Sequence, residues 1–213
     1  MITVKKSFSI ETKLNGTEIL KQLEKIGRTC YKSENLINEE SAEKFIKNII
    51  MKGHEAIIEH YSVTVRIICD RGVSHEIVRH RIASYAQEST RYCNYSKDKF
   101  SNQLTFVEPS FWDISTESGR KRMEIWQSVM KYIEDKYMEL IESGAAPQEA
   151  RSILPNSLKT EIVVTMNLRE WRHFFKLRTA NDAHPQIREI AIPLLDEFKR
   201  RIPIIFDDIS IES

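Results

Sequence analysis

The stretch HYSVTVRIICDRGVSHEIVRHR, residues 60–81, contains the two periodicities that decide the fold class. Residues 60–69 alternate, and one face of the predicted strand carries Tyr61, Val63, Val65, Ile67 and Cys69. Residues 72–81 have a helical pattern, which predicts that the basic triplet at 79–81 lies near the end of a helix. A strand is therefore followed directly by a helix.

The same two patterns recur on both sides of this stretch. Strands are predicted at residues 2–10, 104–107 and 160–167. Helices are predicted at 17–28, 39–52, 117–143, 169–179 and 185–201. Because these elements do not follow a regular βαβ order, we expect an α+β fold with a mixed β-sheet and flanking helices.

The helix predicted at 117–143 is long and amphipathic. Its buried stripe consists of Met123, Trp126, Met130, Ile133, Tyr137 and Leu140. Gly144 is a typical residue for ending such a helix. We interpret the stripe as core rather than as part of a cofactor site.

Length and charge limit the class of protein. The chain has 213 residues, which predicts a single domain over residues 1–213 with a substantial core. Its 32 basic and 31 acidic residues leave a net charge of +1. A protein that binds duplex DNA usually has a large basic excess, so we expect no macromolecular nucleic acid partner.

The N-terminal segment MITVKKSFSI lacks the apolar region of a secretory signal, and no run is long and apolar enough to cross a membrane. Cys30, Cys69 and Cys93 are odd in number and widely spaced. This spacing is typical of reduced thiols rather than of a disulfide framework or a metal site. We therefore expect a cytoplasmic protein that has no membrane partner and no metal.

Glycine-rich phosphate motifs are absent from the sequence. The chain has six glycines and neither GxGxxG nor GxxxxGK[ST]. If it binds nucleotides, side chains must hold much of the phosphate, and arginine suits this role because its planar fork donates two parallel hydrogen bonds. The candidates are Arg79, Arg91, Arg151 and Arg178, and the alternative for each is a surface ion pair.

The triplet Arg79-His80-Arg81 has two interpretations. Successive helical residues are rotated by about 100°, so the three side chains would point in different directions and serve different purposes. Cations at the end of a helix are also favoured by the helix dipole. His54 and His60 are six residues apart, which excludes the HExxH pattern of zinc proteases. They either line a pocket or act as capping or core histidines.

The segment RHRIASYAQES, residues 79–89, matches R-H-R-x7-S, the signature of the flavin-dependent thymidylate synthases. Four further segments resemble that family in the same order: RTCY at 28–31, GHEAIIEH at 53–60, ARSILP at 150–155 and MNLREWRHFFKLR at 166–178. Together they cover most of the chain. The resemblance implies a homotetramer with active sites shared between subunits, which converts dUMP to dTMP using FAD, methylenetetrahydrofolate and NADPH.

The resemblance also implies roles for individual residues. The positions that would contact the flavin are His54, Ala56, Arg79, His80, Arg81, Gln87, Asn167, Arg169 and His173. Those that would contact dUMP are Glu76, Arg79, Gln87, Glu88, Ser89, Thr90, Arg91, Arg151 and Arg178. Ser89 and Arg91 would lie near its phosphate, and Arg178 beside its pyrimidine ring.

The sequence departs from the family pattern at several positions. Glu76 stands where many relatives have glutamine, and an ionised carboxylate can only accept hydrogen bonds. Ala56 replaces a common Ser or Thr of the flavin pocket. The segment AHPQIR at 183–188 replaces a run resembling AQWEIR, and we assign it no role.

Methylation of uracil at C5 requires an electron-rich carbon there. A cysteine thiolate can add to C6, or a fixed cation can stabilise negative charge on the N3–O4 side of the ring. We expect the second mechanism with Arg178 as the cation, because nothing adjacent to Cys93 except Arg91 would activate its thiol. Two rival hypotheses are a non-catalytic nucleotide-binding or nucleic-acid-binding module and a phosphoesterase that uses His80 and His54.

Overall fold

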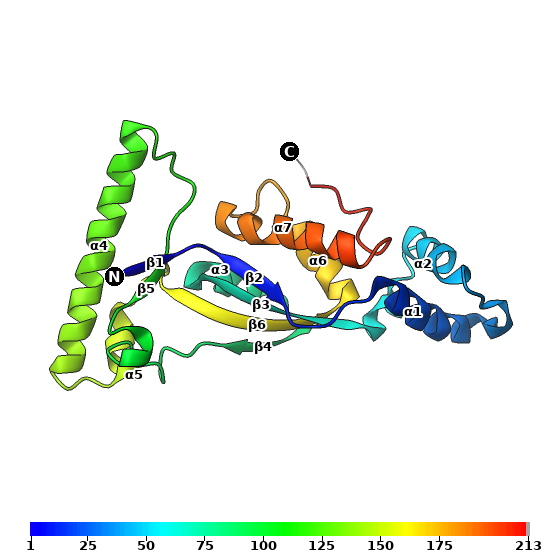
Figure 1. Ribbon diagram of the computed structural model, residues 1–213, viewed down its shortest axis with the longest axis horizontal. Coiled ribbons are helices and arrows are strands. Elements are labelled where there is room, and N and C mark those ends of the chain that lie inside the picture. Colours follow the sequence, from blue (N-terminus) through cyan, green and yellow to red (C-terminus); the bar gives the residue numbers. More distant parts are fainter. Residues whose placement is uncertain (212–213) are drawn as a thin grey trace. The chain divides into compact units, whose positions relative to one another are not determined.

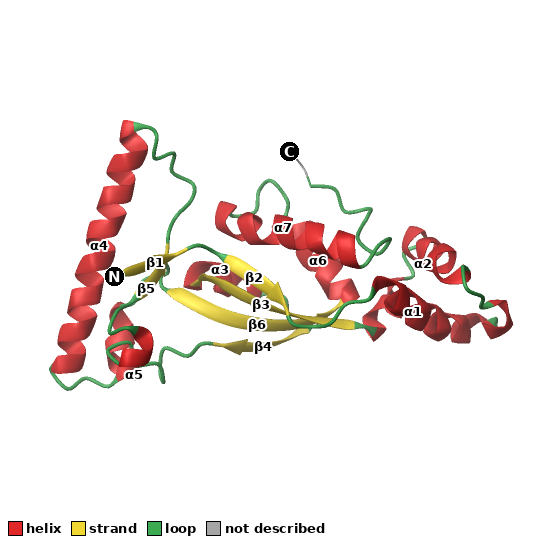
Figure 2. Ribbon diagram, in the orientation of Figure 1, coloured by secondary structure: helices red, strands yellow, loops and turns green. Residues whose placement is uncertain are grey.

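The computed structural model describes residues 1–211, in which helices and strands mix as in an α+β fold (Figures 1 and 2). The strands are β1 (Ile2–Val4), β2 (Ser7–Ile10), β3 (Ser62–Asp70), β4 (Ala83–Gln87), β5 (Thr105–Val107) and β6 (Lys159–Asn167). The α-helices are α1 (Gly16–Tyr31), α2 (Ser41–Met51), α3 (Arg71–Ile77), α4 (Glu117–Glu142), α5 (Pro147–Ala150), α6 (Leu168–Arg178) and α7 (Pro185–Arg201). The short 3-10 helices are η1 (Glu34–Leu36), η2 (Glu55–His60), η3 (Asp98–Phe100) and η4 (Arg151–Ile153). The predicted fold class is confirmed.

The strands form two sheets. β1 and β5 pair in parallel, with Ile2 opposite Thr105, and the larger sheet has the order β2-β3-β6-β4. The single strand predicted at residues 2–10 was therefore wrong, because β1 pairs with β5 whereas β2 pairs with β3. The prediction for β3 was right: Val63, Val65 and other inward positions are completely buried.

The chain divides into two compact units. Unit 1 consists of Met1–Ser7, Ile67–Arg79 and Ala86–Ile162, and unit 2 of Phe8–Arg66, His80–Tyr85 and Val163–Ser213. The division passes through the basic triplet, between Arg79 and His80. The single domain expected over residues 1–213 stays a prediction.

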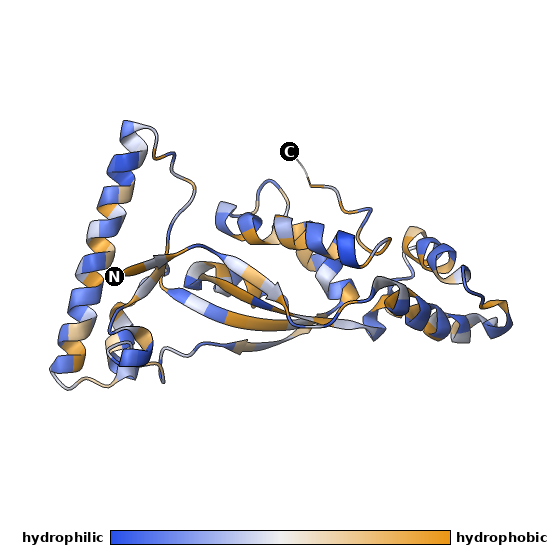
Figure 3. Ribbon diagram, viewed as in Figure 1, coloured by the Kyte–Doolittle hydropathy of each residue, from blue (hydrophilic) through white to orange (hydrophobic). Residues whose placement is uncertain are grey.

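Unit 1 contains α4, along which polar and apolar residues are interspersed (Figure 3). The α4 stripe packs against Tyr95, Leu104 and Phe106, so the interpretation of the stripe as core is confirmed. The carboxylate of Glu134, 3% exposed, accepts a hydrogen bond from the Leu104 backbone and pairs with the N-terminal amine at 2.8 Å. Gly144 follows the helix with a φ of +98°, a backbone conformation that residues with a side chain rarely adopt.

Unit 2 contains α6 and α7 side by side (Figure 1). Their shared core is aromatic and fully buried, and it consists of Trp171, Phe174, Phe175, Phe198 and Phe206. The Trp171 indole donates to the Val63 carbonyl at 3.0 Å, which fixes α6 against β3. α6 is thereby a rigid base for the side chains on its other face.

The helix predicted at 72–81 is shorter than expected. α3 ends at Ile77, and after a turn the chain enters β4, a strand that the sequence patterns did not predict. The backbone amide of Glu88, just past β4, donates to the Glu161 carbonyl at 2.9 Å. Pairing with β6 thus competes successfully with continuation of the helix.

No helix within residues 1–211 is long and apolar enough to cross a membrane.

Candidate functional site

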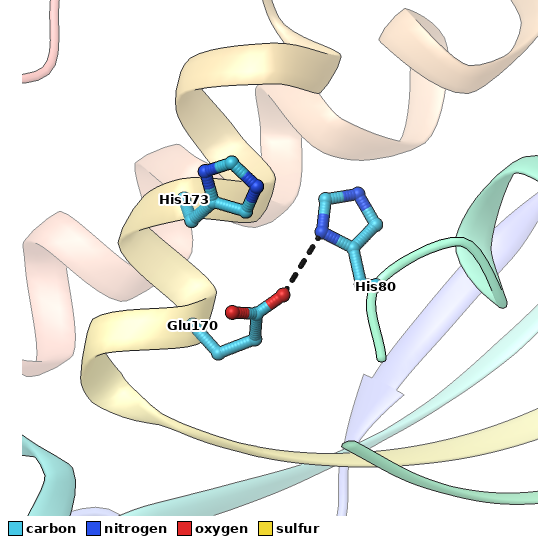
Figure 4. A group of neighbouring side chains, drawn as sticks. All are labelled: His80, Glu170 and His173. Carbon is cyan, nitrogen blue, oxygen red and sulfur yellow. Dashed lines mark hydrogen bonds and ion pairs between the residues drawn. The ribbon is translucent and has the colours of Figure 1, made fainter. Parts of the chain in front are cut away.

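His80 lies in the loop between α3 and β4, and its ring faces one side of α6 (Figure 4). It is 3% exposed and packs against the rings of His173 and Phe174, with centroids 5.5 and 5.1 Å away. Nδ1 of His80 lies 3.2 Å from Oε1 of Glu170. Because residues 170, 173, 174 and 178 share helical spacing, α6 presents all four side chains toward the loop.

Arg178 approaches His80 at its other ring nitrogen. Its Nε donates to Nε2 of His80 at 3.2 Å. An arginine Nε always carries its proton, so Nε2 must be the acceptor and the ring proton lies on Nδ1, where it is donated to Glu170. The tautomer of His80 is set by its two neighbours.

Burial, the positive charge of Arg178 and the nearby His173 together lower the pKa of His80 from 6.5 to about 4. Burial also raises the pKa of Glu170, and the charge of His173 opposes this shift. At neutral pH the contact between His80 and Glu170 is therefore a hydrogen bond from a neutral ring and not an ion pair. The site holds a neutral imidazole between a carboxyl group and a guanidinium.

A cavity of about 440 Å³ opens beside this group. It is lined by Glu55, Glu59, Ile82, Asn167, Arg169, Glu170, Arg172, His173 and Lys176. Three of the predicted flavin contacts, Asn167, Arg169 and His173, are thus brought together. Asn167 caps α6 by accepting a hydrogen bond from the Glu170 amide at 2.8 Å, so the cap residue both starts the helix and faces the cavity.

Two cavity arginines are held by carboxylates. Arg169 pairs with Glu59 at 2.5 Å. Arg172, 2% exposed, is held by Glu55 at 3.0 Å and by both carboxylate oxygens of Asp208. Lys176 is exposed in the same cavity. A ligand there would meet several hydrogen-bond donors, and Lys176 offers a compact ammonium group on a flexible side chain.

His80, Glu170 and His173 also have the composition of a metal site, since their ligand atoms lie within 4.8 Å of one another. Both ring nitrogens of His80 already take part in hydrogen bonds, and the guanidinium of Arg178 would repel a cation. The arrangement therefore favours a hydrogen-bonded positioning group over a metal centre.

The three side chains of the basic triplet point in different directions, as expected, but for a reason other than helical rotation. His80 is buried, while Arg79 and Arg81 on either side of it are exposed. The three side chains diverge because the backbone turns after α3 and not because they follow a helix. Tyr85 anchors this turn by donating its hydroxyl proton to the His80 carbonyl.

His54 and Ala56 are not among the residues that line the cavity. Both are exposed, and Nδ1 of His54 lies 3.1 Å from the Tyr31 hydroxyl. His54 immediately precedes η2 (Glu55–His60), and His60 is its last residue, six positions further along the chain. Their flavin contacts stay predictions.

The predicted dUMP contacts at residues 87–91 lie at the end of β4 in unit 1. The amide of Gln87 donates to the hydroxyls of Ser74 and Thr160 at 2.9 and 3.1 Å. The carboxylate of Glu88 accepts from Lys159 at 2.8 Å and from the Tyr95 hydroxyl at 3.1 Å. The Gln87 and Glu88 side chains therefore fix the position of the turn.

Beyond Glu88 the chain forms a compact turn. The Ser89 carbonyl accepts from the Cys93 amide at 2.9 Å, and the Ser89 hydroxyl accepts from the Arg91 amide at 3.3 Å. Thr90 is buried, whereas Arg91 is exposed. Their substrate contacts, and those of Arg79, stay predictions.

Two further predicted dUMP contacts lie elsewhere in unit 1. Arg151 is exposed at the start of η4, and Glu76 is partly buried in α3. Their roles as nucleotide contacts also stay predictions.

Cys69 and Cys93 both have raised thiol pKa values. Burial raises the pKa of Cys69 to about 12, with the charge of Asp70 adding to it. Burial and the charge of Glu88 raise the pKa of Cys93, which is partly buried. A raised pKa means less thiolate at neutral pH, and the thiolate is the nucleophilic form.

Sequence reasoning did not find Glu170, Tyr85 and Lys176 as site residues. Glu170 lies three residues before His173 and Lys176 three residues after it, so the three side chains lie on neighbouring turns of α6. That helical spacing was the available signal. Tyr85 gave none, because β4 itself was not predicted.

Comparisons of sequence and of structure identify known proteins that are similar to this chain. Residues 14–204 match the family model described as thymidylate synthase complementing protein. The chain is 41% identical over 176 residues to the flavin-dependent thymidylate synthase of Pyrococcus furiosus, covering 82% of this chain and 70% of that one. It is 37% identical over 188 residues to the flavin-dependent thymidylate synthase of Geobacter sulfurreducens, covering 85% and 78%.

A similar fold occurs in the crystal structure of the UMP/dUMP methylase PolB from Streptomyces cacaoi bound with 5-Br dUMP. The TM-score is 0.80 at 19% identity, with 97% of this chain and 96% of that chain covered. The family match extends over most of the described residues and includes every predicted site position. The chain belongs to the thymidylate synthase complementing protein family, whose members include the flavin-dependent thymidylate synthases.

Proposed function

We propose that this protein converts dUMP to dTMP, with methylenetetrahydrofolate as the one-carbon donor and NADPH as the source of reducing equivalents. It is an enzyme, a flavin-dependent methyltransferase, as its family membership shows. Methylation of dUMP is supported by the thymidylate synthase names of the relatives. The observation that carries the proposal is the arrangement of three side chains beside a donor-rich cavity: His80 comes from the R-H-R-x7-S motif, and Glu170 and Arg178 come from α6.

The cavity fits part of a flavin dinucleotide. Its volume of about 440 Å³ lies toward the lower end of the range of roughly 300–1,000 Å³ for ligand sites. Asn167, Arg169, His173 and Lys176 provide donors suited to flavin carbonyls and a pyrophosphate. A dinucleotide exceeds a site of this size, which supports the proposal that subunits of a homotetramer share each active site.

FAD held by Asn167, Arg169 and His173 would supply the hydride for the new methyl group. Arg178 activates the substrate: its guanidinium carries five N–H donors, and Nε is used by His80. The terminal nitrogens would donate to the N3–O4 side of uracil and stabilise the negative charge that makes C5 nucleophilic. The raised pKa of Cys93 supports a mechanism without a cysteine nucleophile.

In this proposal the turn at 87–91 binds the nucleotide. Gln87 and Glu88 hold the backbone through Ser74, Thr160, Lys159 and Tyr95, and Ser89 and Arg91 receive the phosphate. The alternative of a phosphoesterase using His80 gains no support. Both ring nitrogens of His80 take part in hydrogen bonds, so attack by His80 on a phosphate would require breaking one of these bonds.

The purified protein should be yellow, release FAD on denaturation and, with oxygen excluded, turn over NADPH only when dUMP and methylenetetrahydrofolate are both present. Chromatography of the product should show dTMP in equal amount to the NADPH consumed. A protein that takes up no flavin on incubation with FAD, or that binds flavin and forms no dTMP, contradicts the proposal. Light scattering should report a tetramer; an active monomer would exclude sites shared between subunits.

A further inference from the structure

We propose that Glu170 is a positioning residue that orients the guanidinium of Arg178 through the ring of His80. The inference rests on the proposed function, because it concerns the arginine that would activate dUMP. Glu170 itself is not among the residues that the family resemblance assigned to a ligand. Its role follows from three groups in unit 2 and two hydrogen bonds.

The direction of both hydrogen bonds is determined by chemistry. Arg178 can only donate, so Nε2 of His80 accepts from it over 3.2 Å. The other nitrogen, Nδ1, must then carry the proton, and the Glu170 carboxyl oxygen accepts it over 3.2 Å. If Glu170 were removed, the proton could move to Nε2, and two N–H groups would then face each other between His80 and Arg178.

The first member of this chain of hydrogen bonds is held firmly. The Glu170 side chain is 9% exposed, and its backbone amide is fixed by the cap residue Asn167. Glu170 and Arg178 stand eight residues apart on α6, so His80 bridges two positions of one helix face. The rings of His173 and Phe174 restrict rotation of the imidazole.

The groups that face His80 also keep it neutral. Arg178 and His173 oppose a positive charge on the ring, and Glu170 is the acidic group that contacts it. A protonated His80 would repel Arg178, and its Nε2 could no longer accept the hydrogen bond from the Arg178 guanidinium. The carboxyl group therefore acts as the acceptor that selects one tautomer rather than as the partner of an imidazolium.

The first test reads the tautomer directly. Nitrogen NMR of histidine-labelled protein distinguishes the Nδ1–H form from the Nε2–H form, and it requires neither substrate nor turnover. We expect Nδ1–H for His80 in the wild type and a shift toward Nε2–H in Glu170→Ala. Glu170→Gln keeps a carbonyl acceptor and should retain the wild-type signal.

The second test measures kinetics of the flavin-loaded enzyme. Glu170→Ala should lower kcat for dTMP formation by roughly 10- to 100-fold, the usual effect of removing a group that orients another. The KM for dUMP should change little, because the phosphate contacts on the turn are intact, and Glu170→Gln should restore most of kcat. Glu134→Ala is the matched control: this glutamate is also buried, at 3% exposed, and its loss should destabilise unit 1 without altering the His80 signal.

The results separate this inference from the proposed function. Wild-type protein that forms no dTMP refutes the function, while the NMR result still decides the role of Glu170. An unchanged His80 tautomer in Glu170→Ala overturns the inference whether or not activity falls. Equal losses of kcat in the Ala and Gln variants also overturn it, since they would show that the charge of Glu170 acts and not its acceptor.

Discussion

Two glutamates, Glu88 in unit 1 and Glu170 in unit 2, hold their surroundings in different ways. Glu88, in the turn of unit 1, faces the cation Lys159 and the hydroxyl of Tyr95. Glu170, in unit 2, faces a neutral imidazole. In the turn, charge attraction fixes a loop. Beside α6, the direction of a hydrogen bond orients a guanidinium, so shape and protonation matter more there than net charge.

This difference makes the two regions sensitive to different changes. A salt bridge tolerates small displacements because Coulomb attraction falls gradually with distance. A hydrogen bond weakens steeply once its angle departs from the preferred range. We therefore expect conservative substitutions to be most damaging in the His80 region, and the predictions below test that expectation.

The largest effect is expected for Arg178→Lys. Lysine keeps the charge but lacks the planar fork and the Nε–H that His80 accepts. Loss of one donor to a transition state costs on the order of 10²–10³ in rate, so kcat at saturating dUMP should fall by that factor. Turnover equal to that of the wild type would show that charge alone suffices, and the two regions would not differ.

The next effect concerns acid stability. The pKa of His80 is lowered from 6.5 to about 4, so between these pH values the unfolded chain binds a proton that the folded protein does not. The free energy of unfolding should fall as pH drops through this window, by on the order of 3 kcal/mol from this residue. The raised pKa of Glu170 acts in the opposite direction.

Urea titrations of wild type and His80→Asn between pH 6.5 and 4 isolate the histidine contribution. The variant should show the shallower loss of stability. Equal slopes would mean that His80 is charged in the folded protein, and its contact with Glu170 would then be an ion pair like that of Glu88.

A smaller effect is expected from Lys159→Met. Removal of the cation leaves the Glu88 carboxylate partly buried beside Tyr95, which should cost about 1–3 kcal/mol of unfolding free energy and raise the KM for dUMP. The double variant Lys159→Met/Glu88→Gln should recover part of the loss, because no unpaired charge remains. No recovery in the double variant would indicate that hydrogen-bond direction also controls the turn.

The smallest effect is expected at the cysteines. Burial raises the pKa of Cys93, and serine keeps its approximate size, so Cys93→Ser should retain dTMP synthesis within about tenfold. Cys30→Ser and Cys69→Ser should behave alike. A folded, flavin-loaded Cys93→Ser enzyme without activity, together with a covalent adduct of wild-type Cys93 and 5-fluoro-dUMP, would show that the turn supplies a nucleophile as well as binding.

Local patterns predicted much of the fold. The long helix expected at 117–143 is α4 at Glu117–Glu142, and the strand expected at 160–167 is β6 at Lys159–Asn167. Amphipathic periodicity extends over many residues in these elements, so neighbours in sequence suffice to define them. The R-H-R-x7-S motif could indicate the family because it also lies within one short segment of the chain.

The tertiary structure decided what depends on distant partners. The strand expected at 2–10 was split because β1 and β2 pair in different sheets, and α3 ended at Ile77 because β4 joins the larger sheet. Glu170 and His80 are 90 residues apart, and no periodicity links them. A sequence pattern records which side chains share a face of one element. Which faces then meet depends on packing between elements that are far apart in the chain. That packing also determines which of the two imidazole nitrogens of His80 carries the proton.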